Sequence, residues 1–212
     1  IGEGAFEASG IETIDISNLQ LTKIENNVFS YSSLSYIKIP SSVTSIGDNA
    51  FSDCSEITNI EIPPSITSIG KGSFKCCGLD KFPDYLQLTE INDSAFYQCY
   101  MTEVNIPSTV KIISSFAFAN CFNLIKITIP SSVTKIGDSA FCNCTQLPEI
   151  TIPNSITTIS MKTFETCKKL ERISFPDSIK EIGEKAFYKC VKLINISIPD
   201  SVTKIGNNAF GE

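Results

Sequence analysis

Residues 121–144 read CFNLIKITIPSSVTKIGDSAFCNC, and variants of this stretch recur along the whole chain of 212 residues. The most regular marker is a phenylalanine that returns every 22 or 23 residues. A fixed period of this length is typical of solenoids, in which each repeat stacks on its neighbours because it cannot bury its apolar face alone. The markers are Phe6, Phe29, Phe51, Phe74, Phe96, Phe118, Phe141, Phe164, Phe187 and Phe210.

Each repeat divides into a short strand, a proline and a turn around the phenylalanine. In Ile127-Thr128-Ile129 apolar and polar residues alternate, which is the period of a strand with one buried face. Pro130 follows at once and ends the strand, because proline cannot donate a hydrogen bond to the ladder. The Ala140-Phe141 step predicts a turn of helix or 3₁₀-helix whose aromatic ring fills the core between neighbouring repeats.

Glycine recurs four residues before the marker phenylalanine, and one repeat has Asn92 in that position. This preference predicts a backbone with positive φ at a turn, although Glu25, Ser114 and Ser160 break the pattern. The glycines are Gly47, Gly70, Gly137, Gly183 and Gly206.

The period continues without a break, so we expect one array over residues 1–212 with about nine repeats. Neither end has the polar cap that a solenoid needs, and we therefore expect the chain to be a fragment of a longer protein. The formal net charge is −6 and no basic stripe is present, which argues against nucleic-acid binding. No apolar run is long enough to predict a transmembrane segment.

The L-x2-I-x-I-P strand resembles the strand of leucine-rich repeats, and the I-G-x2-A-F-x2-C tail is similar to the BspA-like, or Treponema pallidum-type, variant. The resemblance covers the whole chain and departs locally at Cys77–Pro83, where the strand is about three residues short. It implies an α/β solenoid with a parallel sheet on its concave side, and short strands and helical turns elsewhere. Members are commonly cell-surface or secreted proteins of bacteria and parasitic protists that act in adhesion and protein binding.

Seven of the nine cysteines follow the marker phenylalanine by three residues, which predicts one column rather than a set of pairs. Parallel side chains on neighbouring turns would strain a disulfide, so we expect buried, reduced thiols. Cys76 and Cys142 lie outside the column, and a metal site is the alternative interpretation for them. Zinc sites usually add C-x2-C pairs or histidine, and the chain has no histidine. We expect no metal and no cofactor.

Stacking the repeats places two columns of exposed side chains on the predicted concave face. One column alternates in charge at Asp15, Lys38 and Glu61, and its neighbour contains Tyr36. The columns could simply stabilise the sheet through cross-strand pairs, or they could form a partner surface. The irregular segment 79–88, with Tyr85 and Asp84, is a second possible binding site because irregular loops often carry function. The candidate surface residues are Tyr36, Lys38, Glu61, Tyr85, Asn105, Lys126, Thr128, Glu149, Thr151, Arg172, Ser174 and Ser197.

No catalytic motif, phosphate loop or histidine is present, so we expect a non-catalytic module that binds a protein ligand, which includes glycoproteins and matrix proteins. A cell-surface or secreted adhesin or receptor ectodomain is the main hypothesis. An intracellular, cytoplasmic scaffold or signalling-regulator domain with leucine-rich repeats is the alternative. A threonine column that includes Thr44 and Thr67 raises ice binding as a further alternative, although threonine suits any exposed strand.

Overall fold

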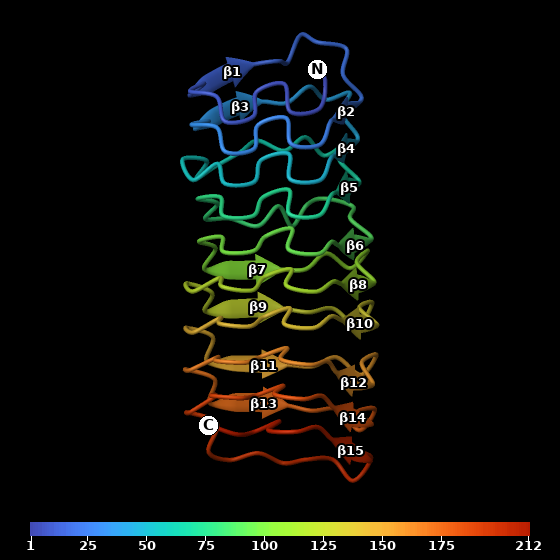
Figure 1. Cartoon of the computed structure of the whole chain (residues 1–212). Helices are drawn as coiled ribbons and strands as arrows, with labels where there is room; N and C mark the ends of the chain where they lie inside the picture. Colours follow the sequence, from blue (N-terminus) through green and yellow to red (C-terminus); the bar gives the residue numbers. More distant parts are fainter.

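The computed structural model describes all residues, 1–212, as one solenoid whose turns stack in chain order (Figure 1). Three-residue strands lie on one side, which we call the main sheet face, and two-residue strands lie on another. The main sheet face contains β1 (Thr13–Asp15), β3 (Tyr36–Lys38), β7 (Glu103–Asn105), β9 (Lys126–Thr128), β11 (Glu149–Thr151) and β13 (Arg172–Ser174). That this face is the concave one stays a prediction.

The second row of strands lies where the chain approaches the phenylalanine turn. Its nine members pair in parallel in three groups of three, β2-β4-β5, β6-β8-β10 and β12-β14-β15. They are β2 (Lys23–Ile24), β4 (Ser45–Ile46), β5 (Ser68–Ile69), β6 (Glu90–Ile91), β8 (Ile112–Ile113), β10 (Lys135–Ile136), β12 (Thr158–Ile159), β14 (Glu181–Ile182) and β15 (Lys204–Ile205).

The predicted parallel register of the main strands is confirmed, but they do not form one continuous sheet. They pair as β1-β3, β7-β9 and β11-β13, and a single bridge joins Lys38 to Glu61. Between β9 and β11 the cause is Pro148, because it lacks the N–H that Ile125 and Glu171 donate to the preceding turn. A second interruption lies at residues 79–83, where the strand is short, and residues 193–199, after β13, form no strand.

The marker phenylalanines form a continuous stack through the core, as predicted. Ring centroids of neighbours lie 5.3–5.7 Å apart, with interplanar angles of 2–11°. The eight inner rings are buried, whereas Phe6 is half-buried and Phe210 is 37% exposed, so the expectation that all ten are buried was wrong at the two ends. A terminal turn has a neighbour on one side only.

The backbone around each phenylalanine consists of successive turns, with no α-helix or 3₁₀-helix, so the expected helical turns and the α/β label do not hold. The phenylalanine N–H donates to the carbonyl that precedes the next marker, at 2.7–3.0 Å in all nine cases from Phe6 to Phe187. Alternate residues instead bond within their own turn, as Ser30 N–H does to Asn27 C=O at 3.1 Å. No element is a helix of the length and apolarity that crossing a membrane requires.

Positive φ occurs at residues other than those predicted. It recurs two residues before and two residues after the phenylalanine, with values from 52° to 63°. Around Phe164 these positions are Lys162 and Thr166, at 57° and 62°. A left-handed backbone costs a residue with a Cβ roughly 1–2 kcal/mol, and a β-branched residue such as threonine is the least suited to it. The bonds between turns offset that cost.

The recurrent glycine serves close approach rather than positive φ. Gly47 and Gly137 are not among the residues with positive φ. A Cβ on Gly47 would lie 2.8 Å from the backbone nitrogen of Asn26, and one on Gly137 would lie 2.6 Å from that of Ser115. Neighbouring turns therefore approach so closely here that a side chain would displace the backbone.

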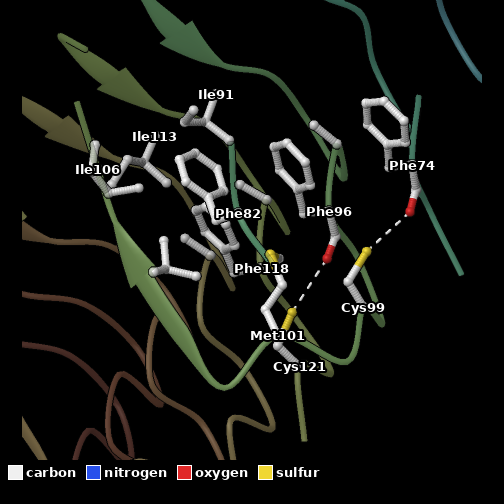
Figure 2. Packing of buried hydrophobic residues seen from close by; sticks show 14 of the residues in the cluster. Phe74, Phe82, Ile91, Phe96, Cys99, Met101, Ile106, Ile113, Phe118 and Cys121 are labelled. Atoms are coloured by element: carbon white, nitrogen blue, oxygen red, sulfur yellow. Dashed lines mark hydrogen bonds between the residues drawn. The ribbon is translucent and has the colours of Figure 1, made fainter. Parts of the chain in front are cut away.

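The cysteine column is buried, and all nine cysteines are free thiols. Each column thiol donates to the carbonyl of the marker phenylalanine one turn earlier, as Cys99 Sγ does to Phe74 O at 3.1 Å and Cys121 Sγ to Phe96 O at 3.3 Å (Figure 2). Burial raises the pKa of the Cys121 thiol to about 12, and this suppresses the reactive thiolate at neutral pH. The column acts as a hydrogen-bonded part of the core.

We expect Phe141→Ala to cost about 3–5 kcal/mol of unfolding free energy, because it leaves a cavity between two fully packed neighbours. Phe210→Ala should cost far less, since that ring has one stacked neighbour and is partly exposed. Chemical unfolding of both variants measures the difference. Equal losses would contradict a core built from nearest-neighbour stacking.

Thr166→Asn should stabilise the chain by about 0.5–1 kcal/mol, because asparagine tolerates a left-handed backbone better than threonine does. The new amide would also lie one turn after Asn143, which already donates to Asn120 at 2.8 Å. The matched control is Thr151→Asn, in an extended strand, which should give no gain. A lower unfolding midpoint for Thr166→Asn would contradict the strain argument.

A thiol-reactive dye should modify Cys76 and Cys142 first in the folded chain, because only these two are incompletely buried. After denaturation without reductant, the count should rise to nine. Fast modification of Cys121 or Cys144 in the native state, or a disulfide between two column cysteines, would contradict the hydrogen-bonded column.

Candidate functional site

The main sheet face holds the two predicted columns of exposed side chains in register. Tyr36 lies beside Thr13, and Lys38 beside Asp15, on β3 and β1. The same register pairs Asn105 with Thr128 on β7 and β9, and Thr151 with Ser174 on β11 and β13. Ser197 is exposed but lies outside any strand. The threonine column beside the two-residue strands mostly forms hydrogen bonds within the chain. Thr44 and Thr67, for example, donate to carbonyls of the preceding turn.

Charges in the second half of this face pair with one another. Arg172 Nη2 lies 2.7 Å from Glu149 Oε2, and Lys126 Nζ lies 3.9 Å from Glu103 Oε2. The hydrogen bonds that Arg172 donates to Glu149 raise the pKa of its guanidinium. These side chains are exposed, so their role in stability is small. The paired charges are less available to a partner than free ones.

The first half of the face leaves its charges free. Lys38 and Glu61 are bridge partners, yet no ion pair within 4.0 Å joins them. Tyr36 lies two residues before Lys38 on β3, in the neighbouring column of exposed side chains, and is 48% exposed. Asp15 has a lowered pKa chiefly because Ser17 hydrogen-bonds to it, and Lys38 contributes least. An exposed aromatic ring and unpaired charges of both signs therefore lie together here.

The short turn at residues 79–83 leaves a pocket of about 360 Å³ beside these charges, which we call the notch. Its volume lies at the small end of the range that ligand pockets occupy. It is lined by Thr58, Asn59, Ile60, Glu61, Ile62, Leu79, Lys81, Phe82, Pro83, Asp84 and Tyr85.

The backbone shows which residues the short turn lacks. Asp80 N–H donates to Thr58 C=O, as Ile125 N–H does to Thr102 C=O in a regular turn. Phe82 therefore lies level with Ile60, and Lys81 belongs to the column of Tyr36 rather than to that of Glu61. Pro83 then follows Phe82 directly, whereas Glu61 and Ile62 separate Ile60 from its proline. The segment from Cys77 to Pro83 is thus three residues shorter than Cys54 to Pro63, as predicted, and two of the three missing residues belong to the strand.

Two aromatic residues shape the notch. Phe82 is buried and packs against Phe96 and Phe118, with centroids 5.2 and 5.8 Å away, so it fills the core of the short turn (Figure 2). Tyr85 is half exposed, as predicted, but its hydroxyl donates to Ile62 C=O at 2.6 Å. Partial burial raises the pKa of the Tyr85 phenol. The irregular segment is thus held in place rather than free.

The structure does not gather all of the candidate residues at one place. Glu61 and Tyr85 line the notch, whereas Lys126, Thr128, Glu149 and Thr151 line a separate depression at the gap between β9 and β11. Arg172 and Ser174 line a third, farther along the face. The candidate surface is therefore a strip with distinct sections.

Sequence reasoning missed several exposed aromatic residues, and two of them lie together. Tyr100 and Phe122 are 56% and 46% exposed and line a depression of about 170 Å³ with Gln98, Asn120 and Asn123. A signal was present, because the residue after the column cysteine is aromatic only in these two turns. They lie away from the strands of the main sheet face.

The titratable groups give little support to catalysis. No group of three or more Asp, Glu, Cys or His is placed to hold a metal ion. Cys142 has its thiol pKa raised to about 11, first by burial and then by Glu165, which lies 3.8 Å away. A nucleophilic thiol needs the opposite shift.

Three solved structures share this fold. A leucine-rich repeat protein from Bacteroides ovatus is 24% identical with a TM-score of 0.53, and the match covers 100% of this chain and 79% of that one. A leucine-rich cell surface protein from Faecalibacterium prausnitzii is 22% identical with a TM-score of 0.58, and the match covers 96% of this chain and 79% of that one. The T. pallidum leucine-rich repeat protein is 20% identical with a TM-score of 0.55, and the match covers 87% of this chain and 78% of that one. A search of curated protein sequences finds no match.

The family comparison covers every residue of the chain. The sequence model of the family described as BspA type leucine-rich repeat region matches residues 1–92 and 89–212. The match agrees with the strand, proline and Ala-Phe pattern and with the parallel stack of turns. The chain therefore belongs to the BspA-type leucine-rich repeat family.

Proposed function

We propose that this chain is a non-catalytic module that binds a protein partner through the first half of its main sheet face. The observation that carries the proposal is the grouping of exposed Tyr36 and the unpaired charges of Lys38 and Glu61 beside the notch. Tyrosine is enriched among residues that dominate interface energies, and unpaired charges steer a partner during encounter. The second half of the face, where charges pair internally, contributes less.

The proposed setting is the cell surface or the secreted fraction, within an adhesin or receptor ectodomain. The similar structure from Faecalibacterium prausnitzii is described as a leucine-rich cell surface protein. Such a role also suits a rigid scaffold whose exposed columns can be varied without disturbing the core.

An intracellular scaffold is the second candidate, and the free thiols favour it. Nine free cysteines are more common where the environment keeps thiols reduced. The burial of the column weakens this preference, because thiols that donate to core carbonyls are shielded from oxidants in either compartment. Cys76 and Cys142 are less buried, so they are the cysteines whose oxidation would depend on the compartment.

The double variant Tyr36→Ala with Lys38→Glu should weaken binding about tenfold or more, because it removes the aromatic anchor and reverses the unpaired charge. A partner identified by cross-linking to the immobilised chain is purified, and its Kd for each variant is measured by interferometry. The matched control is Ser174→Ala with Ser197→Ala on the same face, which should change Kd less than twofold. Unchanged binding by the first variant together with loss in the control would contradict the proposed location.

A further inference from the structure

The regular turns show what a complete ladder looks like on the main sheet face. Ile106 N–H donates to Thr128 C=O at 3.0 Å, and Ile152 N–H to Ser174 C=O at 3.2 Å. Consecutive residues of a strand direct their backbone groups to opposite sides, so the residue between two such positions bonds the other neighbouring strand. Each turn thus presents one N–H and one C=O to a single residue of the following turn.

At the notch the residue that should receive these groups is absent. Ile62 occupies the position of Ile106, but its N–H turns back to Ile60 C=O at 3.1 Å. Ile60 C=O and Ile62 N–H are the two groups that the missing strand residue would bond. They satisfy each other only because no third residue lies between the turns.

The strand that follows the short turn on the main sheet face, β7, also has a free ladder edge. β7 pairs with β9 alone, and Ile106 N–H faces β9. The backbone groups of the adjacent Asn105 therefore face the short turn. There the carbonyl of Phe82 accepts from Asp84 N–H at 3.0 Å within its own loop. The segment Ile60–Ile62 and β7 thus each have a ladder position that no strand residue of the chain pairs with.

We propose that the notch accepts an extended stretch of a partner polypeptide, two residues long, in the place of the two missing strand residues. The stretch lies parallel to the neighbouring strands. Its first residue donates to Ile60 C=O and accepts from Ile62 N–H, and its second residue donates to Asn105 C=O. Addition of a strand to an open ladder gives affinity through the main chain, and side-chain pockets give specificity. This inference deepens the protein-binding function proposed above and rests on it.

The charges around the notch favour a basic residue at the first position of the bound stretch. Its side chain would point outward in the column of Asp15, Lys38 and Glu61, whose signs alternate, so a positive charge continues the series. The notch also contains Asp84 and Lys81, and its two carboxylates outnumber its one ammonium group.

Shape selects an apolar second residue and limits the length. Its side chain would point inward against Ile60, Ile62 and Leu79, which supply the apolar wall. A third ligand residue would need Ile62 C=O, which the Tyr85 hydroxyl already occupies. The recognised unit is therefore a basic-apolar dipeptide within an extended segment.

The test uses the full chain labelled with ¹⁵N and the blocked probe acetyl-Ser-Lys-Val-Ser-amide. We expect chemical-shift changes centred on Ile60, Ile62 and Asn105, with a Kd of roughly 1 mM, as suits a few hydrogen bonds and one small apolar contact. Replacement of lysine by glutamate in the probe should weaken binding at least fivefold, and N-methylation of the Lys and Val amides should abolish it. Saturating concentrations that leave these amides unshifted, or an N-methylated probe that binds equally well, would overturn the inference.

Two variants locate the site within the chain. Glu61→Gln should weaken the lysine probe several-fold while leaving a glutamine version of the probe unaffected, and Glu149→Gln on the same face should change neither. Insertion of Lys-Val between Phe82 and Pro83 should fill the notch and abolish probe binding. Retained binding by a folded insertion variant would overturn the inference, and Glu61→Gln decides the matter if the insertion prevents folding.

The same set separates the two proposals. If the probe fails while the partner still depends on Tyr36 and Lys38, the dipeptide inference is wrong and the binding function stands. If the probe binds at the notch but partner affinity is indifferent to Tyr36, Lys38 and Glu61, the proposed function is wrong.

Discussion

Every part of this molecule depends on the requirement that each turn place its backbone groups opposite those of the next turn. A turn of 22 or 23 residues has no core of its own, and its phenylalanine ring is buried only when another ring lies 5.3–5.7 Å away on each side. The phenylalanine N–H bonds the next turn in all nine cases from Phe6 to Phe187, which keeps the rings in register. Burial and hydrogen bonding therefore reinforce one another along the same axis.

Several columns of small side chains extend this register. The cysteine thiols donate to phenylalanine carbonyls of the preceding turn, and Ser65 and Ser132 donate in the same manner to carbonyls on another side of the stack. The phenylalanine carbonyls, which already accept an N–H within their own turn, thus gain a second partner, and the serines supply a partner to the carbonyls of Val43 and Val110. Close packing of the turns has two costs. Left-handed residues are needed around each phenylalanine, and positions such as Gly47 and Gly137 leave no room for a Cβ.

The irregular turn is informative because the rest is so regular. Phe82 packs against Phe96 and Phe118 and fills the core of this turn, so the absence of two strand residues leaves no cavity in the core. The deficit moves to the surface instead, where Ile60 and Ile62 bond each other and the Tyr85 hydroxyl covers a carbonyl. A repeat protein can in this way gain a local binding position without losing the stability that its uniform turns supply. Free charges at Lys38 and Glu61 lie beside that position.

The period, the alternating strands, the buried phenylalanines, the cysteine column and the side-by-side exposed columns were all predictable from sequence, because a fixed repeat makes residue i and its counterpart one period later spatial neighbours. Candidate residues such as Tyr36, Lys38 and Glu61 followed from the same rule. The reason for the glycines, the left-handed residues, the break at Pro148 and the pairing of Arg172 with Glu149 were decided by the tertiary structure. So was the notch. These features depend on how closely two backbones approach and on which hydrogen bonds lack a partner, and a repeat pattern specifies which residues are neighbours but not those distances.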